Sequence, residues 1–87
     1  MYYVYMLKNS YDDLYVGISE KPNKRLVAHN KNQGANFTKN NKNFALVFLE
    51  EYGTLTEARK REMQIKKWRR DKKEFLIEKY FKKLETK

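Results

Sequence analysis

Several side chains that could act together on a phosphate group lie between residues 5 and 62. They are two tyrosines, an arginine, the single histidine and a glutamate: Tyr5, Tyr15, Arg25, His29 and Glu62. A tyrosine phenolate can accept a proton from water, and a guanidinium can bond the oxygens of a phosphate. A carboxylate can hold a divalent cation. Each residue alone is commonplace, so only their joint order and their placement on suitable elements make them candidates.

Two β-rich segments, residues 2–7 and 14–18, carry the tyrosines, and the aspartates between them favour a turn. Side chains along a strand point alternately to the two faces of a sheet. If Tyr5 pairs opposite Tyr15, this alternation divides the hairpin residues into two sets. One face holds Tyr3, Tyr5, Leu7, Tyr15 and Gly17, and the other holds Val4, Met6, Leu14, Val16 and Ile18. The apolar face is predicted to be core. The tyrosine face has a glycine gap that leaves room for a ligand, although plain cross-strand packing is the commoner role of such tyrosines.

A helix is predicted over residues 22–31. Pro22 suits its first turn, and Arg25 and His29 stand one turn apart on it. The next segment, residues 32–43, is polar, rich in Asn and Lys, and long for a connection in a small domain. It is either a substrate-contacting loop or a simple connector.

The third strand is predicted over residues 44–52, where a nearly continuous apolar run indicates burial on both faces. A capping box, with Thr54 as N-cap and Glu57 three residues later, predicts a helix over residues 55–69. A similar pattern at residues 71–74 predicts a third helix. Its apolar stripe consists of Leu76, Ile77, Tyr80, Phe81 and Leu84.

Glu62 falls in the inward stripe of the second predicted helix. The other members of that stripe are Leu55, Ala58, Ile65 and Arg69. A carboxylate that faces inward needs a cation or hydrogen bonds, because burying it unpaired is costly. Both an ion pair, with Arg25 or a lysine, and a bound metal ion would satisfy Glu62.

Positive charge is concentrated near the C-terminus. Residues 1–58 hold seven Lys/Arg and six Asp/Glu, a net of +1, whereas residues 59–87 hold thirteen and five, a net of +8. Such a block predicts a polyanionic partner such as nucleic acid, with a solvated basic face as the alternative. The predicted phosphate contacts between the last two helices are Lys66, Lys67, Arg69, Arg70 and Lys73. Trp68, among them, can stack on a base or pack the helices together.

The composition excludes several classes of protein. The length of 87 residues predicts a single domain over residues 1–87. The absence of cysteine excludes disulfides and a thiolate zinc site, and one histidine excludes a multi-histidine metal cluster. No apolar run approaches the roughly 20 residues of a membrane span. Because residue 1 leads directly into strand-like sequence, we expect no signal peptide and a cytoplasmic protein.

The residues Tyr3-Val4-Tyr5 and Tyr15-Val16-Gly17 resemble the two half-motifs of the GIY-YIG nuclease family. The resemblance continues through an arginine ten residues after Tyr15, a histidine one turn later and a glutamate in a later helix. It covers essentially the whole chain and is strongest to small stand-alone members of the UPF0213 type, relatives of the N-terminal nuclease domain of the ABC excinuclease. Tyr3 stands where the family has its first glycine, and the two valines stand for isoleucine.

We therefore expect a GIY-YIG endonuclease-like α+β fold with the order β-β-α-β-α-α. Its small three-stranded, mainly antiparallel sheet would have flanking helices. The hairpin strands would be adjacent, with the third strand beside the first. That order makes the second and third strands parallel, joined by a right-handed crossover.

The resemblance implies a metal-dependent DNA endonuclease that acts in repair or on branched or nicked DNA. One Mg²⁺ or Mn²⁺ ion would bind Glu62, Arg25 would bond the phosphate, and Tyr15 would be the general base. The pKa of a free tyrosine is about 10, and a nearby cation favours the phenolate. Tyr5 would orient the water or Tyr15, and His29 would relay a proton or bind phosphate.

Gly17 would let the scissile phosphate approach the backbone. Two other interpretations remain open: a nucleic-acid-binding module that keeps the fold without catalysis, and an RNA- or ribosome-associated basic protein. RNA also stays open as a substrate of the nuclease.

Overall fold

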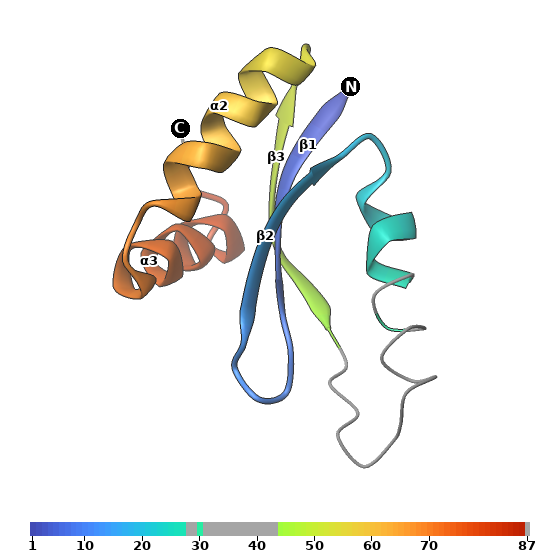
Figure 1. The fold of residues 1–87 in the computed structure, drawn as a ribbon. Helices are drawn as coiled ribbons and strands as arrows, with labels where there is room; N and C mark the ends of the chain where they lie inside the picture. The colour runs from blue at the N-terminus through green and yellow to red at the C-terminus, as the bar shows by residue number, and fades with distance from the viewer. Residues whose placement is uncertain (28–29, 31–43, 87) are drawn as a thin grey trace.

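A three-stranded antiparallel sheet forms the centre of the molecule (Figure 1). The computed structural model describes residues 1–27, 30 and 44–86. Its strands are β1 (Tyr2–Lys8), β2 (Leu14–Ser19) and β3 (Ala45–Tyr52), in the order β2-β1-β3. Both outer strands run antiparallel to β1, so β2 and β3 are parallel to each other. The predicted α+β class and strand order are confirmed.

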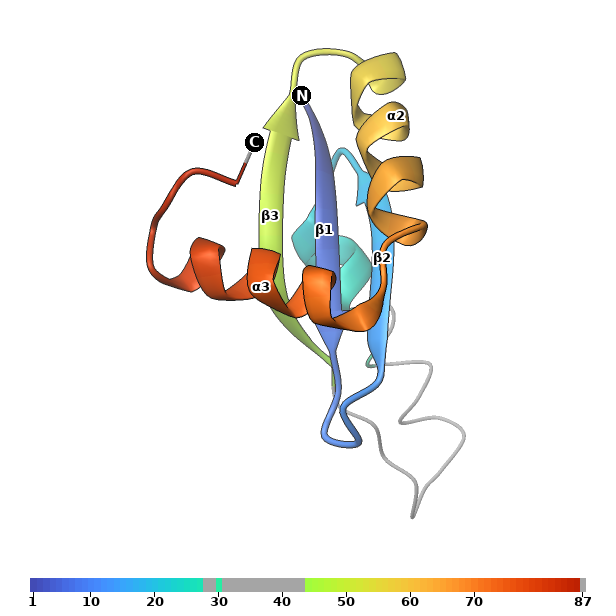
Figure 2. The ribbon, with the colours of Figure 1, turned by 90° about the vertical axis from the view of Figure 1, so that its left-hand side faces the viewer.

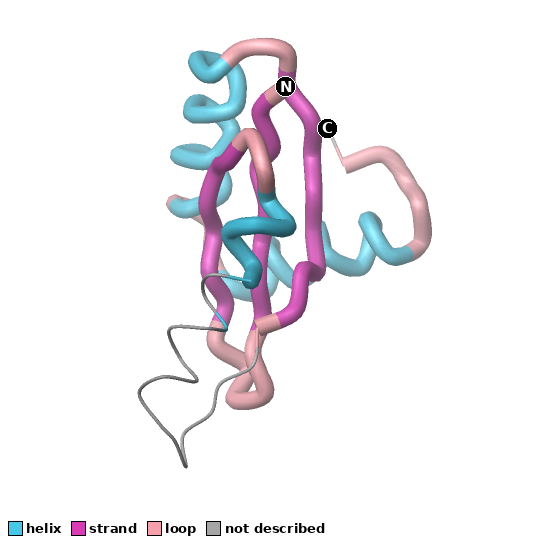
Figure 3. The backbone as a smooth tube through the Cα atoms, turned by 90° about the vertical axis from the view of Figure 1, so that its right-hand side faces the viewer, coloured by secondary structure: helices cyan, strands magenta, loops and turns pink. Residues whose placement is uncertain are grey.

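Helices cover both faces of this sheet. The first helix, described over residues 22–27 and at residue 30, lies in front of the sheet in Figure 3. Helices α2 (Leu55–Lys66) and α3 (Arg70–Phe81) lie on the opposite face (Figures 1 and 2). Within the described residues, no helix has the length and apolar character that a membrane crossing needs.

The core lies between the sheet and the pair α2 and α3. It comprises Val4, Met6, Val16, Phe48, Ala58, Ile65, Leu76 and Ile77. Three of these core residues, Val4, Met6 and Val16, come from the predicted apolar face of the hairpin. Leu14 and Ile18, from the same face, pack against the core. The alternation of side chains therefore predicted the core face of the hairpin correctly.

The hairpin register differs by two residues from the predicted one. Tyr5 pairs with Gly17, and Leu7 pairs with Tyr15. The turn determines this register, because Asn9 Oδ1 accepts hydrogen bonds from the backbone N–H groups of Tyr11 (3.0 Å) and Asp13 (2.8 Å). A shift of two residues leaves every side chain on its predicted face.

The prediction that the third strand, β3, is buried on both faces was wrong. The strand that is buried on both faces is β1. Residues 4–7 of β1 are buried because β1 is the central strand. In β3, an edge strand that begins at Ala45, only Phe48 and Glu50 are buried, while Ala45 and Glu51 are exposed.

The predicted start of α2 is confirmed, but its predicted end at residue 69 and the predicted start of α3 at residue 71 were wrong. Thr54 Oγ1 accepts the Glu57 N–H at 3.2 Å. The helix ends at Lys66 and not at residue 69, because Lys67 N–H turns back to the carbonyls of Gln64 and Ile65. Arg69 then has extended dihedrals and is the N-cap of α3, without a side-chain capping bond.

The start of α3 is held against the β1–β2 turn. Lys8 Nζ lies 2.8 Å from Glu74 Oε1, and Arg70 Nη2 donates to the carbonyl oxygen of Asp12 at 2.7 Å. The predicted apolar stripe of α3 is only partly buried. Leu76 and Ile77 lie in the core, whereas Phe81 and Leu84, at the end that projects past the sheet, are exposed.

Candidate active site

Tyr5, Gly17 and Tyr15 lie side by side on the face of the sheet that the first helix covers. A Cβ added to Gly17 would lie 2.7 Å from Tyr5 Oη and 3.1 Å from Tyr15 Cε2. The rings of Tyr5 and Tyr15 are tilted, with centroids 6.2 Å apart. The ring of Tyr5 therefore fills the gap at Gly17 that was predicted to receive a ligand. Contact between Gly17 and nucleic acid stays a prediction.

The hydroxyl of Tyr5 is buried, and it has no hydrogen-bond partner within the described residues. Burial raises the pKa of Tyr5, and the opposing influence of Arg25 is smaller. Tyr5 is thus protonated at neutral pH. A buried hydroxyl left without any partner would cost about 1–3 kcal/mol, so Tyr5 Oη is a group with free hydrogen-bonding capacity beside Arg25.

Arg25 reaches the two phenols from the first helix. Attraction to the Tyr5 oxygen, with a smaller contribution from Tyr15, raises the pKa of Arg25. This attraction falls short of a hydrogen bond of ordinary geometry, because Tyr5 Oη has no such partner among the described residues. The exposed guanidinium is therefore charged, close to both tyrosines and able to accept an anion.

The two tyrosines differ in their access to solvent. Tyr5 is on the central strand and has no exposed surface, whereas Tyr15 is on the edge strand β2 and is 37% exposed. A water molecule can therefore reach Tyr15 directly. The protonated Tyr5 beneath it keeps its proton and can donate a hydrogen bond.

A hollow of about 400 Å³ lies on the same face, between the sheet and the start of the first helix. It is lined by Tyr3, Glu20, Lys21, Pro22, Asn23, Lys24 and Leu49. Tyr3 Oη donates to Glu51 Oε2 at 3.3 Å, and the negative charge of Glu51 raises the pKa of Tyr3. The sequence placed Tyr3 on this face correctly, but sequence reasoning gave it no role in the site.

Glu62 comes from the other helical layer. Its side chain is 15% exposed, and its Oε2 lies 3.2 Å from Lys66 Nζ, one turn later on α2. The predicted ion pair of Glu62, with Arg25 or a lysine, is thus formed with Lys66. The role of Glu62 as a metal ligand stays a prediction. His29 and the segment 32–43 lie outside the described residues.

The model of the GIY-YIG catalytic domain matches residues 1–76 of this chain. The chain belongs to the GIY-YIG family. That family is one of nucleases, so the general class of substrate is nucleic acid. The hairpin with Tyr5 and Tyr15, the first helix with Arg25 and the helix with Glu62 all fall inside the matched residues.

The relatives also support the resemblance to UPF0213 proteins. A UPF0213 protein of Staphylococcus aureus (strain Mu50) is 43% identical over 76 residues, which cover 87% of this chain and 93% of that protein. The UPF0213 protein of strain N315 matches equally. The solution NMR structure of the UPF0213 protein BH0048 from Bacillus halodurans has 30% identity and a TM-score of 0.58, covering 90% of this chain and 84% of that one. The names of these relatives state no activity.

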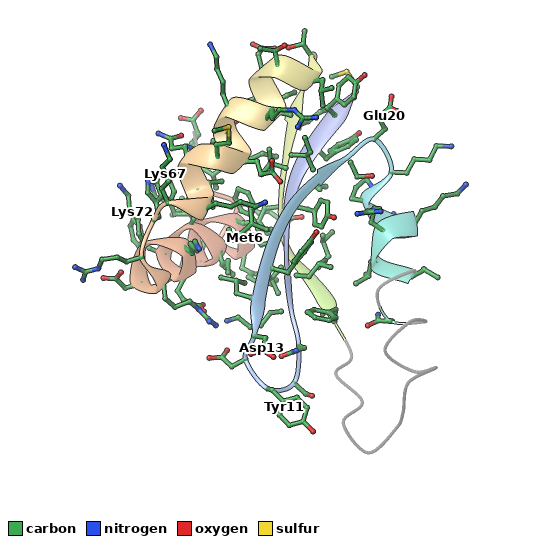
Figure 4. All side chains as sticks on the ribbon, in the orientation of Figure 1. Met6, Tyr11, Asp13, Glu20, Lys67 and Lys72 are labelled. Atoms are coloured by element: carbon green, nitrogen blue, oxygen red, sulfur yellow. The ribbon has the colours of Figure 1, made fainter. Side chains whose placement is uncertain are left out.

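Part of the basic segment of this GIY-YIG domain is paired with carboxylates of the same chain. Lys66 pairs with Glu62, Arg69 with Asp71 at 3.3 Å, and Arg70 with Glu74 at 2.7 Å. Of the five predicted phosphate contacts, Lys67 and Lys73 have no ion pair within the described part of the chain. Figure 4 shows Lys67 and Lys72 on the side of the sheet away from the first helix. The structure therefore does not bring this segment together with the tyrosines.

Sequence reasoning also missed a buried ion pair that joins β3, α2 and the C-terminal segment. Arg61 Nε lies 2.9 Å from Glu50 Oε1, and Arg61 Nη2 donates to the carbonyl of Thr86 at 2.7 Å. Burial alone would raise the pKa of Glu50, but hydrogen bonds from Arg61 and Tyr52 hold that pKa below its ordinary value. Burial and the Glu50 carboxylate raise the pKa of Tyr52 to about 12. Strand alternation, which places residue 50 on the same face as Phe48, was the available signal.

Proposed function

We propose that this chain is a metal-dependent endonuclease that hydrolyses phosphodiester bonds of DNA. Its work would be repair, or the processing of nicked or branched DNA in the cytoplasm. The observation that carries the proposal is the arrangement of Tyr5, packed against Gly17 and Tyr15, beside the charged Arg25.

The proposed roles follow from burial and charge. Arg25 binds the non-bridging oxygens of the scissile phosphate and stabilises the charge that develops on them. Tyr5, protonated because of its burial, donates a hydrogen bond that orients Tyr15 or the attacking water. Tyr15, which solvent can reach, accepts the proton from that water. The water oxygen bonds to phosphorus as the bond to the leaving oxygen breaks.

The hollow beside Tyr3 would hold the part of the DNA strand that flanks the scissile phosphate. Lys21 and Lys24 line it, and Arg25 follows them directly on the first helix. Phosphates on either side of the cleaved bond can therefore contact Lys21, Lys24 and Arg25, while Glu20 lines the same hollow. Contacts of this kind position a nucleic acid without reading its sequence.

Among the described residues, a divalent metal fits only as a water-rich ion. Within residues 1–27, 30 and 44–86, no three His, Cys, Asp or Glu side chains gather closely enough to hold a metal. Mg²⁺ accepts one carboxylate and completes its shell with water and phosphate, and Glu62 is the carboxylate proposed to hold it, or Mn²⁺. Such an ion would stabilise charge on the phosphate and the leaving oxygen. Lys66, whose ammonium group lies 3.2 Å from Glu62 Oε2, would compete with the ion for this carboxylate.

A non-catalytic module that binds DNA or RNA is the second candidate. The observation that favours it is the pairing of Glu62 with Lys66, which satisfies the carboxylate without any metal. In this function, Arg25 and the lysines of the hollow would bind a nucleic acid that is never cut.

Cleavage of labelled DNA and RNA separates the two candidates. The substrates would be duplex, nicked, flap, branched and single-stranded DNA, together with RNA. Each would be incubated with Mg²⁺, Mn²⁺ or a chelator. The nuclease should cut at least one DNA substrate with metal present, and Tyr5→Phe and Glu62→Gln should abolish cutting without abolishing binding. Binding by all three proteins with no cleavage of any substrate would support the non-catalytic module.

A further inference from the structure

The turn between α2 and α3 presents a tryptophan among lysines. Two hollows of about 390 Å³ each meet there and share Lys67 and Trp68. Lys72 lines one of them, and Lys60 and Met63 line the other. We call the surface formed by these five residues the Trp68 surface. Figure 4 shows it, through Lys67 and Lys72, on the face of the molecule away from the first helix.

The indole of Trp68 is fixed on its inner side. Trp68 packs against the core, and the guanidinium carbon of Arg61 lies 5.3 Å from the ring centre. Arg61 cannot easily move, because Glu50 and Thr86 hold it through hydrogen bonds of 2.7–3.1 Å. The ring is thus a pre-positioned platform, which loses little entropy when a ligand stacks on it.

A movable lysine covers this platform. Lys72 Nζ lies 4.4 Å from the centre of the Trp68 ring. The Lys72 side chain is exposed and has no ion pair among the described residues, so rotation of its side chain can uncover the indole. The ammonium group would then lie beside whatever stacks there. A nucleotide suits this arrangement, since its base can replace the cation on the ring while its phosphate binds the same cation.

The surrounding positive charge is not neutralised. Lys60, Lys67 and Lys72 are exposed, and the described structure gives none of them a carboxylate partner. By contrast, Asp71, the acidic residue at the rim, already pairs with Arg69. A strand of phosphates crossing these lysines would release counterions and gain affinity that depends on salt.

We propose that the Trp68 surface binds a single-stranded segment of nucleic acid. One base stacks on Trp68, and the adjacent phosphates bind Lys67 and Lys72. A duplex is a poorer occupant, because its base faces are stacked on one another and only the edges are accessible. This binding extends the proposed function by naming a single-stranded segment as part of the substrate, but it does not require cleavage.

The position of the Trp68 surface supports this choice of ligand. The candidate active site lies on the opposite face of the sheet, and the molecule measures 37 × 26 × 23 Å. Duplex DNA has a persistence length of about 50 nm and does not bend around a body of that size without cost. A flexible single strand can pass around the edge of the sheet and engage both surfaces.

Fluorescence of the protein reports this binding directly, because Trp68 is the only tryptophan in the chain. The intact protein would be titrated with oligothymidylate of about 12 nucleotides, a length typical of single-strand sites, and with a blunt duplex of the same length. A chelator would prevent cleavage. We expect the single strand to quench Trp68 emission saturably, and the duplex to cause at most a small change. Failure of the single strand to quench, or equal quenching by the duplex, would overturn the proposal.

Two matched double variants test the role of the lysines, with binding of a labelled oligonucleotide as the readout. Lys67→Gln/Lys72→Gln should weaken binding about 10-fold and flatten its salt dependence. Lys79→Gln/Lys82→Gln removes the same charge from the far end of α3 and should weaken binding by less than about 2-fold. Equal losses in both variants would mean that charge acts without a defined site, contrary to the proposal.

Variants of Trp68 and Tyr5 separate stacking from folding and from catalysis. Trp68→Leu should weaken binding about 10-fold, and Trp68→Phe should retain part of the affinity because it keeps an aromatic face. Thermal unfolding would show that both variants are folded. Tyr5→Phe should leave the quenching of Trp68 unchanged whether or not the chain is a nuclease. Unchanged affinity in a folded Trp68→Leu variant would refute the stacking role.

Discussion

Tyr5 and Gly17 face each other across β1 and β2 so closely that a methyl group on residue 17 would lie 2.7 Å from Tyr5 Oη and 2.8 Å from its Cζ. Residue 17 must therefore lack a side chain if the ring of Tyr5 is to occupy its observed position. Neither glycine in the described part of the chain has a positive φ, so backbone conformation does not account for the requirement.

Replacement of Gly17 by alanine should consequently displace the ring of Tyr5. We expect a loss of about 1–3 kcal/mol in the free energy of unfolding, as is usual when a packed site is overfilled, together with loss of cleavage. Urea denaturation and the cleavage assay would measure the two effects. Gly53→Ala is the control, since nothing lies within 4 Å of the added Cβ. A Gly17→Ala protein as stable and active as Gly53→Ala would show that Tyr5 does not need its observed position.

Replacement of Tyr5 by phenylalanine should have opposite effects on stability and activity. The hydroxyl is buried without a partner in the described structure, so its removal should raise the free energy of unfolding by about 1 kcal/mol. Cleavage should fall below detection, because Tyr15 or the attacking water loses the hydrogen bond that orients it. Tyr80→Phe, in the layer of α2 and α3, should leave cleavage unchanged. A Tyr5→Phe protein that is destabilised would indicate that the hydroxyl already has a structural partner.

The sequence predicted the faces of the hairpin but not its register. Side-chain alternation places Tyr3, Tyr5 and Gly17 on one face in any register that is shifted by two residues, so hydrophobic pattern alone cannot separate such registers. The choice between them depends on the turn, where the Asn9 side chain bonds two backbone N–H groups. The α+β class and the strand order were predicted by the resemblance together with the element order.

The arrangement around the site was harder to predict, because it depends on contacts between distant elements. The sequence shows that Glu50 is a carboxylate in an apolar strand, but its partner Arg61 is on another element. The distance of the basic segment from the tyrosines depends on which face of the sheet α2 and α3 cover. An apolar stripe shows that a helix packs, without indicating against which face.

The buried pair of Glu50 and Arg61 should be a main determinant of stability. Arg61→Met would leave the Glu50 carboxylate buried without its cation, at a cost of about 3–5 kcal/mol. Adding Glu50→Gln should recover part of this loss, since the remaining amide is uncharged. Urea denaturation of the single and double variants would measure the coupling. Additive losses in the double variant would contradict a direct interaction.

The same pair predicts a pH dependence. The pKa of Glu50 in the folded protein lies below its ordinary value of 4.5. The stability that it contributes is therefore fully present above pH 4.5 and is lost as the pH falls through the folded pKa. Thermal unfolding followed from pH 7 to pH 3 should show a shallower acid decline in Glu50→Gln than in the wild type. If the stability of both proteins falls equally with pH, other carboxylates dominate the loss of stability in acid.

Lys66 should compete with the metal for Glu62, since its ammonium group lies 3.2 Å from Glu62 Oε2. Lys66→Ala should therefore lower the Mg²⁺ concentration that gives half-maximal cleavage, by several-fold, when the nucleic acid is saturating. Lys67→Ala, whose side chain has no carboxylate partner within the described residues, removes the same charge and should leave the metal requirement unchanged. Glu62→Gln should abolish metal-dependent cleavage. If Lys66→Ala and Lys67→Ala shift the metal requirement equally, or Glu62→Gln still cuts, the metal is held elsewhere and the pair on α2 is purely structural.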